Sequence, residues 1–124
     1  MFQIIFNAIS AAELSGLPKL MQLDLLSDFQ LLPNDLDALD GDDRFGRLER
    51  EGRKLYRFRA KDYRIYFERC PEGVTVHRIL HKNTLGDFLY RSKLPMVADE
   101  DEHLGQTRKF WQLIDEGARS GRAG

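Results

Sequence analysis

The chain has 124 residues, of which 42% are hydrophobic and 31% are charged, proportions typical of one soluble globular domain. No apolar run reaches the ~18–20 residues of a membrane-spanning helix, and the N-terminus lacks the basic flank and small-residue cleavage pattern of a secretory signal. The single cysteine excludes an internal disulfide framework and suits a reducing compartment, and the spacing of this cysteine and the three histidines fits no zinc site. We therefore expect a cytoplasmic protein without a metal or other cofactor.

The net charge of −1 conceals three blocks of different charge. Residues 1–43 carry one basic and eight acidic side chains (net −7), residues 44–93 carry fourteen and six (net +8), and residues 94–124 carry four and six (net −2). A basic block of this kind is typical of a surface that binds a polyanion such as nucleic acid. It also fits a basic sheet that is neutralised by acidic helices of the same domain, so charge alone leaves both interpretations open.

The first 46 residues predict a strand, helices and a loop. Phe2–Phe6 is short, apolar and β-prone, which predicts an opening strand. Ser10–Glu13 has the pattern of a capping box, and Pro18 fits the first turn of a helix. Apolar residues then recur at three- and four-residue spacing to about Leu32, which predicts the buried face of an amphipathic helix. These residues are Leu17, Leu20, Met21, Leu25 and Phe29. Residues 34–46 are acidic and rich in turn formers, so we expect a helical turn and a loop there.

Three strand-like segments follow and predict an antiparallel meander. Lys54–Arg59 and Tyr63–Arg69 alternate apolar and polar residues and are separated by a short turn. Val74–His81 is the third segment, but its apolar residues change parity, which indicates a β-bulge or a strand end that is buried on both faces. A helix is then expected to begin at Gly86-Asp87 and to stop at Pro95.

The C-terminal residues predict an acidic link and a final helix. The link is Asp99–Glu102, and residues 117–124 are expected to be frayed. The apolar residues of the helix are Leu104, Phe110, Trp111 and Ile114. The whole order predicts an α+β fold: a small antiparallel sheet made of the N-terminal strand and the C-terminal meander, with the N-terminal helices packed on one face and an extra C-terminal helix.

The alternation of the meander places three arginines on one face, Arg57 and Arg59 of one strand and Arg64 of the next. Like charges that lie opposite each other destabilise a sheet, so an anionic group should lie between them. A phosphate is a natural partner because its oxygens match the guanidinium fork. Acidic residues of the same chain would serve equally, and the pattern does not decide between the two.

The segment LYRFRAKDYRIYFE, the hydrophobic strand and basic turn after it, and the stretch GDFLYR resemble the RelE/ParE superfamily of bacterial toxin–antitoxin systems. The resemblance covers about residues 2–93 in element order and is specific over roughly residues 54–91. It implies a toxin domain at 1–95, a C-terminal extension at 96–124, and function on the open face of the sheet. RelE-like members enter the ribosome and cleave mRNA with the RNA 2′-hydroxyl as nucleophile, and a cognate antitoxin neutralises them.

Carried over by position, Arg64 matches the phosphate-binding arginine of that family, and Tyr90 matches a tyrosine that stacks on a base or assists proton transfer. Where the family has an arginine after the third strand, this chain reads His81-Lys82-Asn83-Thr84, so Lys82 would supply the charge and His81 would transfer the proton. The expected catalytic residues are Lys61, Arg64, His81, Lys82 and Tyr90. The expected RNA-binding residues are Arg57, Arg59, Tyr66, Arg78 and Arg91.

Other functions fit the same sequence. ParE-like members share the fold but inhibit DNA gyrase, and a toxin-like domain with an incomplete catalytic set would only bind nucleic acid or its antitoxin. The C-terminal extension also has two interpretations. Its helix covers exposed apolar surface, or its acidic run Asp99–Glu102 folds over the basic face and imitates an antitoxin. The expected partners are an antitoxin, mRNA and the ribosome, with no membrane, and the oligomeric state stays open.

Overall fold

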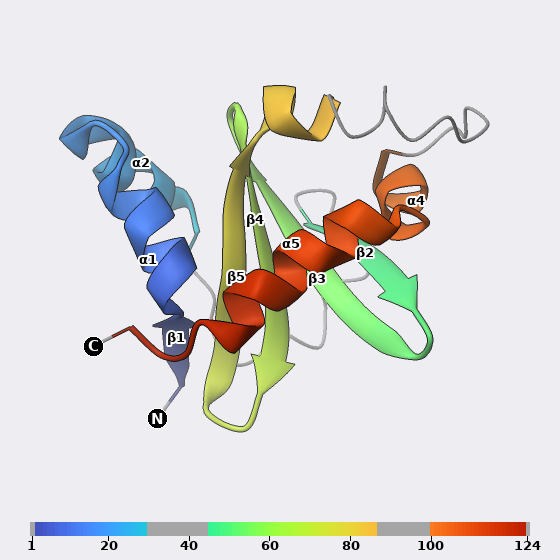
Figure 1. The fold of residues 1–124 in the computed structure, drawn as a ribbon. Coiled ribbons are helices and arrows are strands. Elements are labelled where there is room, and N and C mark those ends of the chain that lie inside the picture. Colours follow the sequence, from blue (N-terminus) through green and yellow to red (C-terminus); the bar gives the residue numbers. More distant parts are fainter. Residues whose placement is uncertain (1, 30–44, 87–99, 124) are drawn as a thin grey trace.

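The computed structural model describes residues 2–29, 45–86 and 100–123, which form an α+β fold with one five-stranded sheet (Figure 1). The strands are β1 (Gln3–Phe6), β2 (Phe45–Arg50), β3 (Arg53–Ala60), β4 (Tyr63–Cys70) and β5 (Gly73–His81). The helices are α1 (Ala8–Ser15), α2 (Lys19–Asp28), α4 (Glu100–Gly105) and α5 (Arg108–Arg119). No helix in these described segments has the length and apolar character to cross a membrane.

The sheet has the order β1-β5-β4-β3-β2 and is mixed, which corrects the expectation of a purely antiparallel sheet. β1 pairs with β5 in parallel, and the other neighbours are antiparallel. The parallel pair begins at Gly73, which lies opposite Gln3 with a φ of 149°. A Cβ at this position would overlap the backbone of Gln3, so only glycine lets the first strand approach this closely.

The meander β3-β4-β5 lies within one residue of the predicted segments at every boundary. β2 was not predicted, because residues up to 46 were assigned to a loop and residues 47–50 to no element. Only Leu48 of this edge strand is buried, so the strand shows little alternation of buried and exposed residues. β2 is joined to β3 by Glu51 and Gly52, whose φ angles of 54° and 83° both lie in the left-handed region. Turns of this kind match the twist of a hairpin and usually carry Asn-Gly or Asp-Gly, so Glu-Gly gives a weak sequence signal.

The change of parity in β5 is a β-bulge, one of the two explanations expected from the sequence. Tyr66 pairs with Arg78 but the next residue, Phe67, pairs with Val76, which leaves His77 as the extra residue of the bulge. Because of the bulge, Val76 and Ile79 face the same core although they differ in parity.

The start of α1 corrects the predicted capping box. The N-cap is Asn7, whose Oδ1 accepts the N–H of Ser10 at 2.7 Å while Ser10 Oγ accepts the N–H of Asn7 at 3.0 Å. Asparagine at the N-cap satisfies the orphan amides of the first turn as well as serine does, so the helix begins three residues earlier than the Ser10–Glu13 pattern predicts. Glu13 is thereby free to contact β5.

Three further helix boundaries differ from the expectations. α2 ends at Asp28, because Phe29 has a ψ of 73°, and does not continue to Leu32. Residues 82–86 are already helical, so a helix follows β5 directly where a basic turn was expected before Gly86. Residues 100–102 of the expected acidic link belong to α4, and α4 and α5 are separate helices where one was expected.

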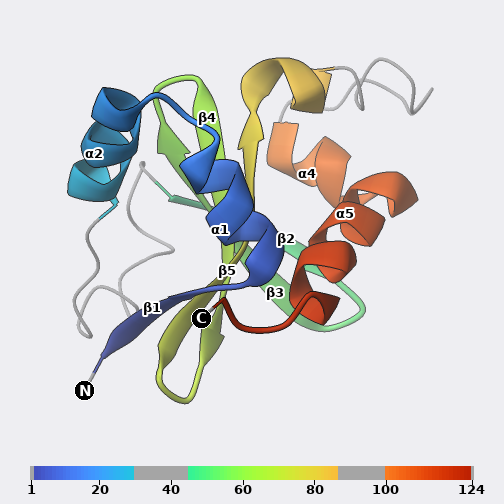
Figure 2. The same cartoon turned by 60° about the vertical axis from the view of Figure 1, so that its left-hand side comes forward.

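Helices cover both faces of the sheet, which corrects the expected open face. Figure 2 places α2 on one side of the sheet and α4 and α5 on the other. The first core lies between the sheet and α1 and α2 and includes Leu25, Phe29, Phe58, Ile65 and Phe67. The second core lies between the sheet and the C-terminal helices and includes Leu55, Tyr66, Leu104, Phe110 and Ile114. The fold is therefore a three-layer arrangement in which part of the basic face of the meander lies under α4 and α5.

The C-terminal tail, expected to fray, is held against the N-terminal strand. Arg122 forms a β-bridge with Asn7, and the N–H of Ala123 donates to the carbonyl of Phe6 at 2.9 Å. The N–H of Ala8 donates to the carbonyl of Gly121, also at 2.9 Å. The two ends of the chain therefore lie side by side, as both views of the ribbon show.

Candidate nucleic-acid interface

The arginines of the meander share one face of the sheet, as the alternation predicts. In the register of β3 and β4, Arg57 lies opposite Tyr66 and Arg59 lies opposite Arg64. The neighbouring residues on this face, Leu55 and Tyr66, belong to the second core. This face therefore has a part that α4 and α5 cover and a part that extends beyond them toward the β3–β4 turn.

Three of the expected RNA-binding side chains lie in the covered part. Tyr66 is fully buried and contacts Phe110 of α5 edge to face, with 5.0 Å between the ring centroids. Arg57 is only 7% exposed and forms an ion pair with Asp101 of α4, in which Nη2 lies 2.7 Å from Oδ2. Arg78 donates from Nε and Nη2 to Glu13 Oε2 at 3.0 and 2.8 Å. In this conformation all three side chains stabilise the packing of helices on the sheet.

The other expected residues gather at one end of the sheet. Lys61 lies in the β3–β4 turn, and Lys82 follows β5 directly, where its N–H donates to the carbonyl of Asp62 at 2.7 Å. His81 pairs with Tyr63 in the register of β4 and β5, and their rings meet edge to face at 5.0 Å. We name this group the basic rim; its residues are Arg59, Lys61, Arg64, His81 and Lys82. Two segments about twenty residues apart in sequence thus meet at the same end of the sheet.

The two lysines of the rim are accessible to a ligand. The side chain of Lys61 is 70% exposed and forms an ion pair with Asp24 at 3.3 Å. The side chain of Lys82 is 52% exposed and forms an ion pair with Asp62 at 3.2 Å. Ion pairs between such exposed groups contribute only about 0–1 kcal/mol. A phosphate that contacts either lysine would therefore displace its carboxylate at little cost.

Arg64 and His81 have more fixed positions in the rim. Arg64 is buried, and its Nη1 donates to the carbonyls of Lys61 and Tyr63 at 2.9 and 3.0 Å, so it stabilises the turn that presents Lys61. The Nδ1 atom of His81 accepts the N–H of Asn83 at 3.0 Å. Because Nδ1 is an acceptor there, the neutral ring carries its proton on Nε2, and that N–H can donate to a phosphate or leaving oxygen.

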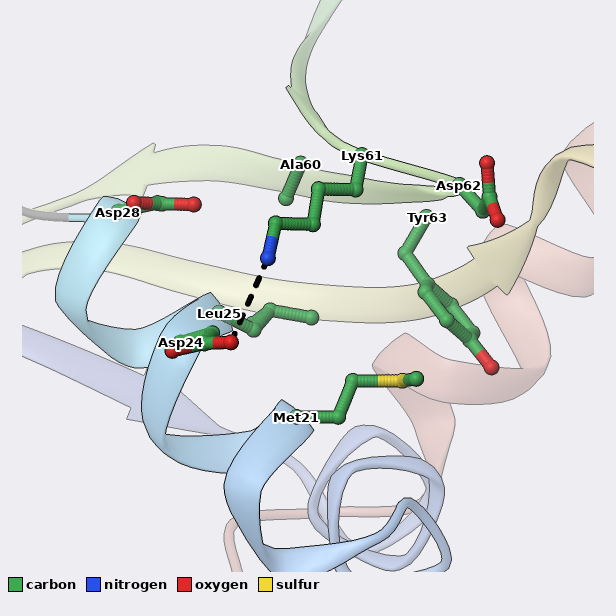
Figure 3. A pocket seen from close by; sticks show the side chains of 8 residues that line it. All are labelled: Met21, Asp24, Leu25, Asp28, Ala60, Lys61, Asp62 and Tyr63. Carbon is green, nitrogen blue, oxygen red and sulfur yellow. Dashed lines mark hydrogen bonds and ion pairs between the residues drawn. The ribbon is translucent and has the colours of Figure 1, made fainter.

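A small cavity adjoins the rim on the side of α2 and was not predicted. It has a volume of about 80 Å³ and lies between α2 and the β3–β4 turn (Figure 3). Its lining combines apolar groups with acids at the edge: Met21, Asp24, Leu25, Asp28, Ala60, Lys61, Asp62 and Tyr63. Figure 3 shows the side chain of Lys61 extended across the mouth toward Asp24. Met21 and Leu25 belong to one predicted core stripe, so no sequence signal indicates a cavity here.

A charged network that was also missed binds α5 to the sheet. Arg53 of β3 donates from Nε to Glu68 of β4 at 2.7 Å and from Nη1 to Asp115 of α5 at 2.5 Å, while its guanidinium lies 5.3 Å from the centre of the Trp111 ring. His77 Nε2 lies 3.1 Å from Glu68 Oε1. Burial acts against the charge of Glu68, but the hydrogen bonds from His77 and Arg53 and the charge of Arg53 outweigh it and lower the pKa of this carboxyl.

Tyr90 and Arg91, the remaining expected site residues, lie outside the described residues. Within the described residues, no three histidine, cysteine, aspartate or glutamate side chains gather as metal ligands. Searches against family models, curated proteins and solved structures found no match for this chain. The functional argument therefore depends on the basic rim, the covered face and the sequence resemblance.

Proposed function

We propose that the protein is a cytoplasmic, RelE-like toxin of a toxin–antitoxin module that inhibits translation by ribosome-dependent cleavage of mRNA without a metal cofactor. One observation carries the proposal. Four of the cationic residues that the resemblance selects, and the histidine, come from two separate segments, yet the register of the strands brings all five to the same end of the sheet, the basic rim. The proposal extends to Tyr90 as a further site residue.

The chemistry of the rim suits cleavage of a phosphodiester by its own 2′-hydroxyl. Lys61 and Lys82 would neutralise the scissile phosphate, because their exposed ion pairs are easily exchanged for phosphate contacts. The 2′-hydroxyl loses its proton to water as its oxygen forms the new bond to phosphorus, and the 5′-oxygen leaves with a proton from water, which yields a 2′,3′-cyclic phosphate and a 5′-hydroxyl. The N–H at Nε2 of His81 would donate a hydrogen bond to the leaving oxygen and so assist this proton transfer.

The proposed protein partner is an antitoxin, and α2 offers a surface for it. Among the described residues, the exposed large hydrophobic side chains all belong to α2: Leu20, Met21, Leu23 and Leu26. Asp24 and Asp28 lie beside them, which favours an amphipathic partner segment with basic residues around an apolar anchor. A neighbouring small reading frame should restore growth when it is co-expressed with the wild type, and it should fail to do so with Leu23→Arg.

The decisive experiment is to induce the protein in bacteria and map the ends of cellular mRNA. We expect cuts in register with codons within translated frames, and we expect Lys61→Gln with Lys82→Gln to abolish them. The matched control is Lys54→Gln, which removes the charge of an exposed lysine at the opposite end of β3. Intact mRNA together with gyrase-dependent DNA damage would refute the nuclease and favour a ParE-like inhibitor, and no toxicity would favour a domain that only binds.

A further inference from the structure

The contact between Arg57 and Asp101 has the geometry of an occupied anion site. Arg57 Nε lies 3.2 Å from each carboxylate oxygen of Asp101, and its Nη2 lies 2.7 Å from Oδ2. Asp101 is 6% exposed and its partner is 7% exposed, so the pair is removed from solvent. A guanidinium that receives two oxygens of one planar or tetrahedral anion in this way can bind a carboxylate or a phosphate.

Gly46 provides the space for the anion. It lies directly opposite Arg57 in the register of β2 and β3. A Cβ at this position would overlap Asp101 Oδ2 and Arg57 Nη2, so any larger residue would fill the hollow that the carboxylate occupies. The hollow belongs to the sheet, and the anion that fills it comes from a separate helix.

The described side chains of α4 and α5 pack on the sheet through different groups. Asp101 and Leu104 are its buried side chains among those described. α5 is held by Phe110, Trp111 and Ile114 in the second core and by the contacts of Arg53. Trp111 Nε1 donates to the carbonyl of Gly105 at 2.8 Å, which fixes the end of α4 nearest α5. A pivot of α4 about Gly105 would leave these contacts of α5 in place.

We propose that α4 is an autoinhibitory strap whose Asp101 occupies a phosphate site formed by Arg57 and Gly46. This inference rests on the proposed function, because the ligand that replaces the carboxylate is an RNA phosphate. Arg59 joins this site to the basic rim, since it is the next residue of β3 on the same face. An RNA strand that is bound at the rim reaches the Arg57 site once α4 has moved aside.

The first test is Asp101→Asn in the full chain, with a fluorescein-labelled single-stranded RNA of about ten nucleotides as the probe. The variant keeps the shape of the side chain and removes the charge that holds Arg57. We expect RNA affinity to rise at least tenfold, and Arg57→Gln in the same background to remove the gain. Asp115→Asn is the matched control, because it removes an acid that pairs with Arg53 on α5, and we expect less than a twofold change. An equal gain in RNA affinity for Asp101→Asn and Asp115→Asn would contradict the proposal that α4 is an autoinhibitory strap.

Hydrogen exchange of the wild type provides a measurement that does not depend on a variant that folds. RNA should accelerate exchange of the amides of α4 and leave those of α5 protected. Slower exchange in α4 upon RNA binding would identify the helix as a fixed part of the interface and would refute the inference.

Cleavage and binding measurements distinguish a failure of the strap proposal from a failure of the proposed function. If the wild type and Asp101→Asn cut mRNA equally, the nuclease stands and the strap is wrong. If neither cuts mRNA but Asp101→Asn binds the RNA probe more tightly through Arg57, the strap stands and the nuclease is wrong.

Discussion

Glu13 of α1 hydrogen-bonds to Arg78 and Ile79 of β5, just beyond the bulge in that strand. Its Oε1 accepts the N–H of Ile79 at 2.9 Å, and its Oε2 accepts both Nε and Nη2 of Arg78. The same arginine donates from Nη1 to the carbonyl of Leu113 in α5 at 3.1 Å. One carboxylate thus links the N-terminal helix, the sheet and the C-terminal helix.

Removing this carboxylate should destabilise the fold. We expect Glu13→Ala to lower the free energy of unfolding by about 2–4 kcal/mol, since it leaves a mostly buried guanidinium and a strand N–H without their acceptor. Urea unfolding measures the loss. Glu116→Ala is the matched control, because this more exposed acid lies 3.7 Å from the same Arg78 and should cost no more than about 0.5 kcal/mol. Equal losses would contradict the assignment.

Local patterns predicted the meander because alternation and turns are encoded within each strand. The sequences of β3 and β4 alternate apolar and polar residues next to short turns, and even the bulge in β5 is visible as a change of parity. In the structure all three strands bury consecutive residues, because helices cover both faces of the sheet. β2 buries a single residue and is defined by its partner β3, so its own sequence is a poor signal. The parallel pairing of β1 depends on Gly73, seventy residues away, and no local pattern records it.

The part of the candidate site that depends on the alternation within the meander was predictable from the sequence. The register of the meander brings Arg59 and Arg64 together, as alternation requires. The positions of α4 and α5 determine which arginines are covered. The charge blocks indicated only that these arginines pair either with acidic residues of the chain or with an anionic ligand. Asp101 meets Arg57 because Gly46 leaves a hollow beside it, and this three-residue arrangement joins segments that no sequence window contains together.

The charged network under α5 should make the fold less stable at acid pH. The pKa of Glu68 is lowered in the folded protein, so the unfolded chain binds this proton more readily. Its contribution to stability is therefore complete above the ordinary glutamate value of about 4.5 and is lost as the pH falls through the lower folded value. We expect Glu68→Gln to be less stable than the wild type at pH 7 and to lose less stability between pH 5 and pH 3. Thermal unfolding across this range measures both, with Glu72→Gln as the control, and parallel curves for Glu68→Gln and the wild type would contradict the prediction.

The approach of α5 to the bulge of β5 requires glycine at position 117. A Cβ there would overlap the carbonyl of His77 and would lie 3.0 Å from Arg78 Cδ and 3.1 Å from Asn7 Nδ2. We expect Gly117→Ala to cost about 1–3 kcal/mol, because overpacking forces the helix off the sheet. Differential scanning calorimetry should record a fall in Tm of roughly 4 °C or more. Gly86→Ala adds the same methyl group where no atom of the described residues, apart from the adjoining backbone, lies within 4 Å, and it should not lower Tm.

The basic rim should determine how RNA binding depends on salt. Each lysine that contacts a phosphate of a single strand contributes about 0.7 to the slope of log K against log salt concentration. The double variant Lys61→Gln, Lys82→Gln should therefore lower the magnitude of the slope by about 1.4, as measured by fluorescence anisotropy from low to moderate salt. Lys54→Gln with Lys109→Gln removes the same total charge from exposed positions away from the rim and should leave the slope nearly unchanged. Equal decreases in the two double variants would mean that RNA responds to the net charge of the protein, and the rim would then have no special role.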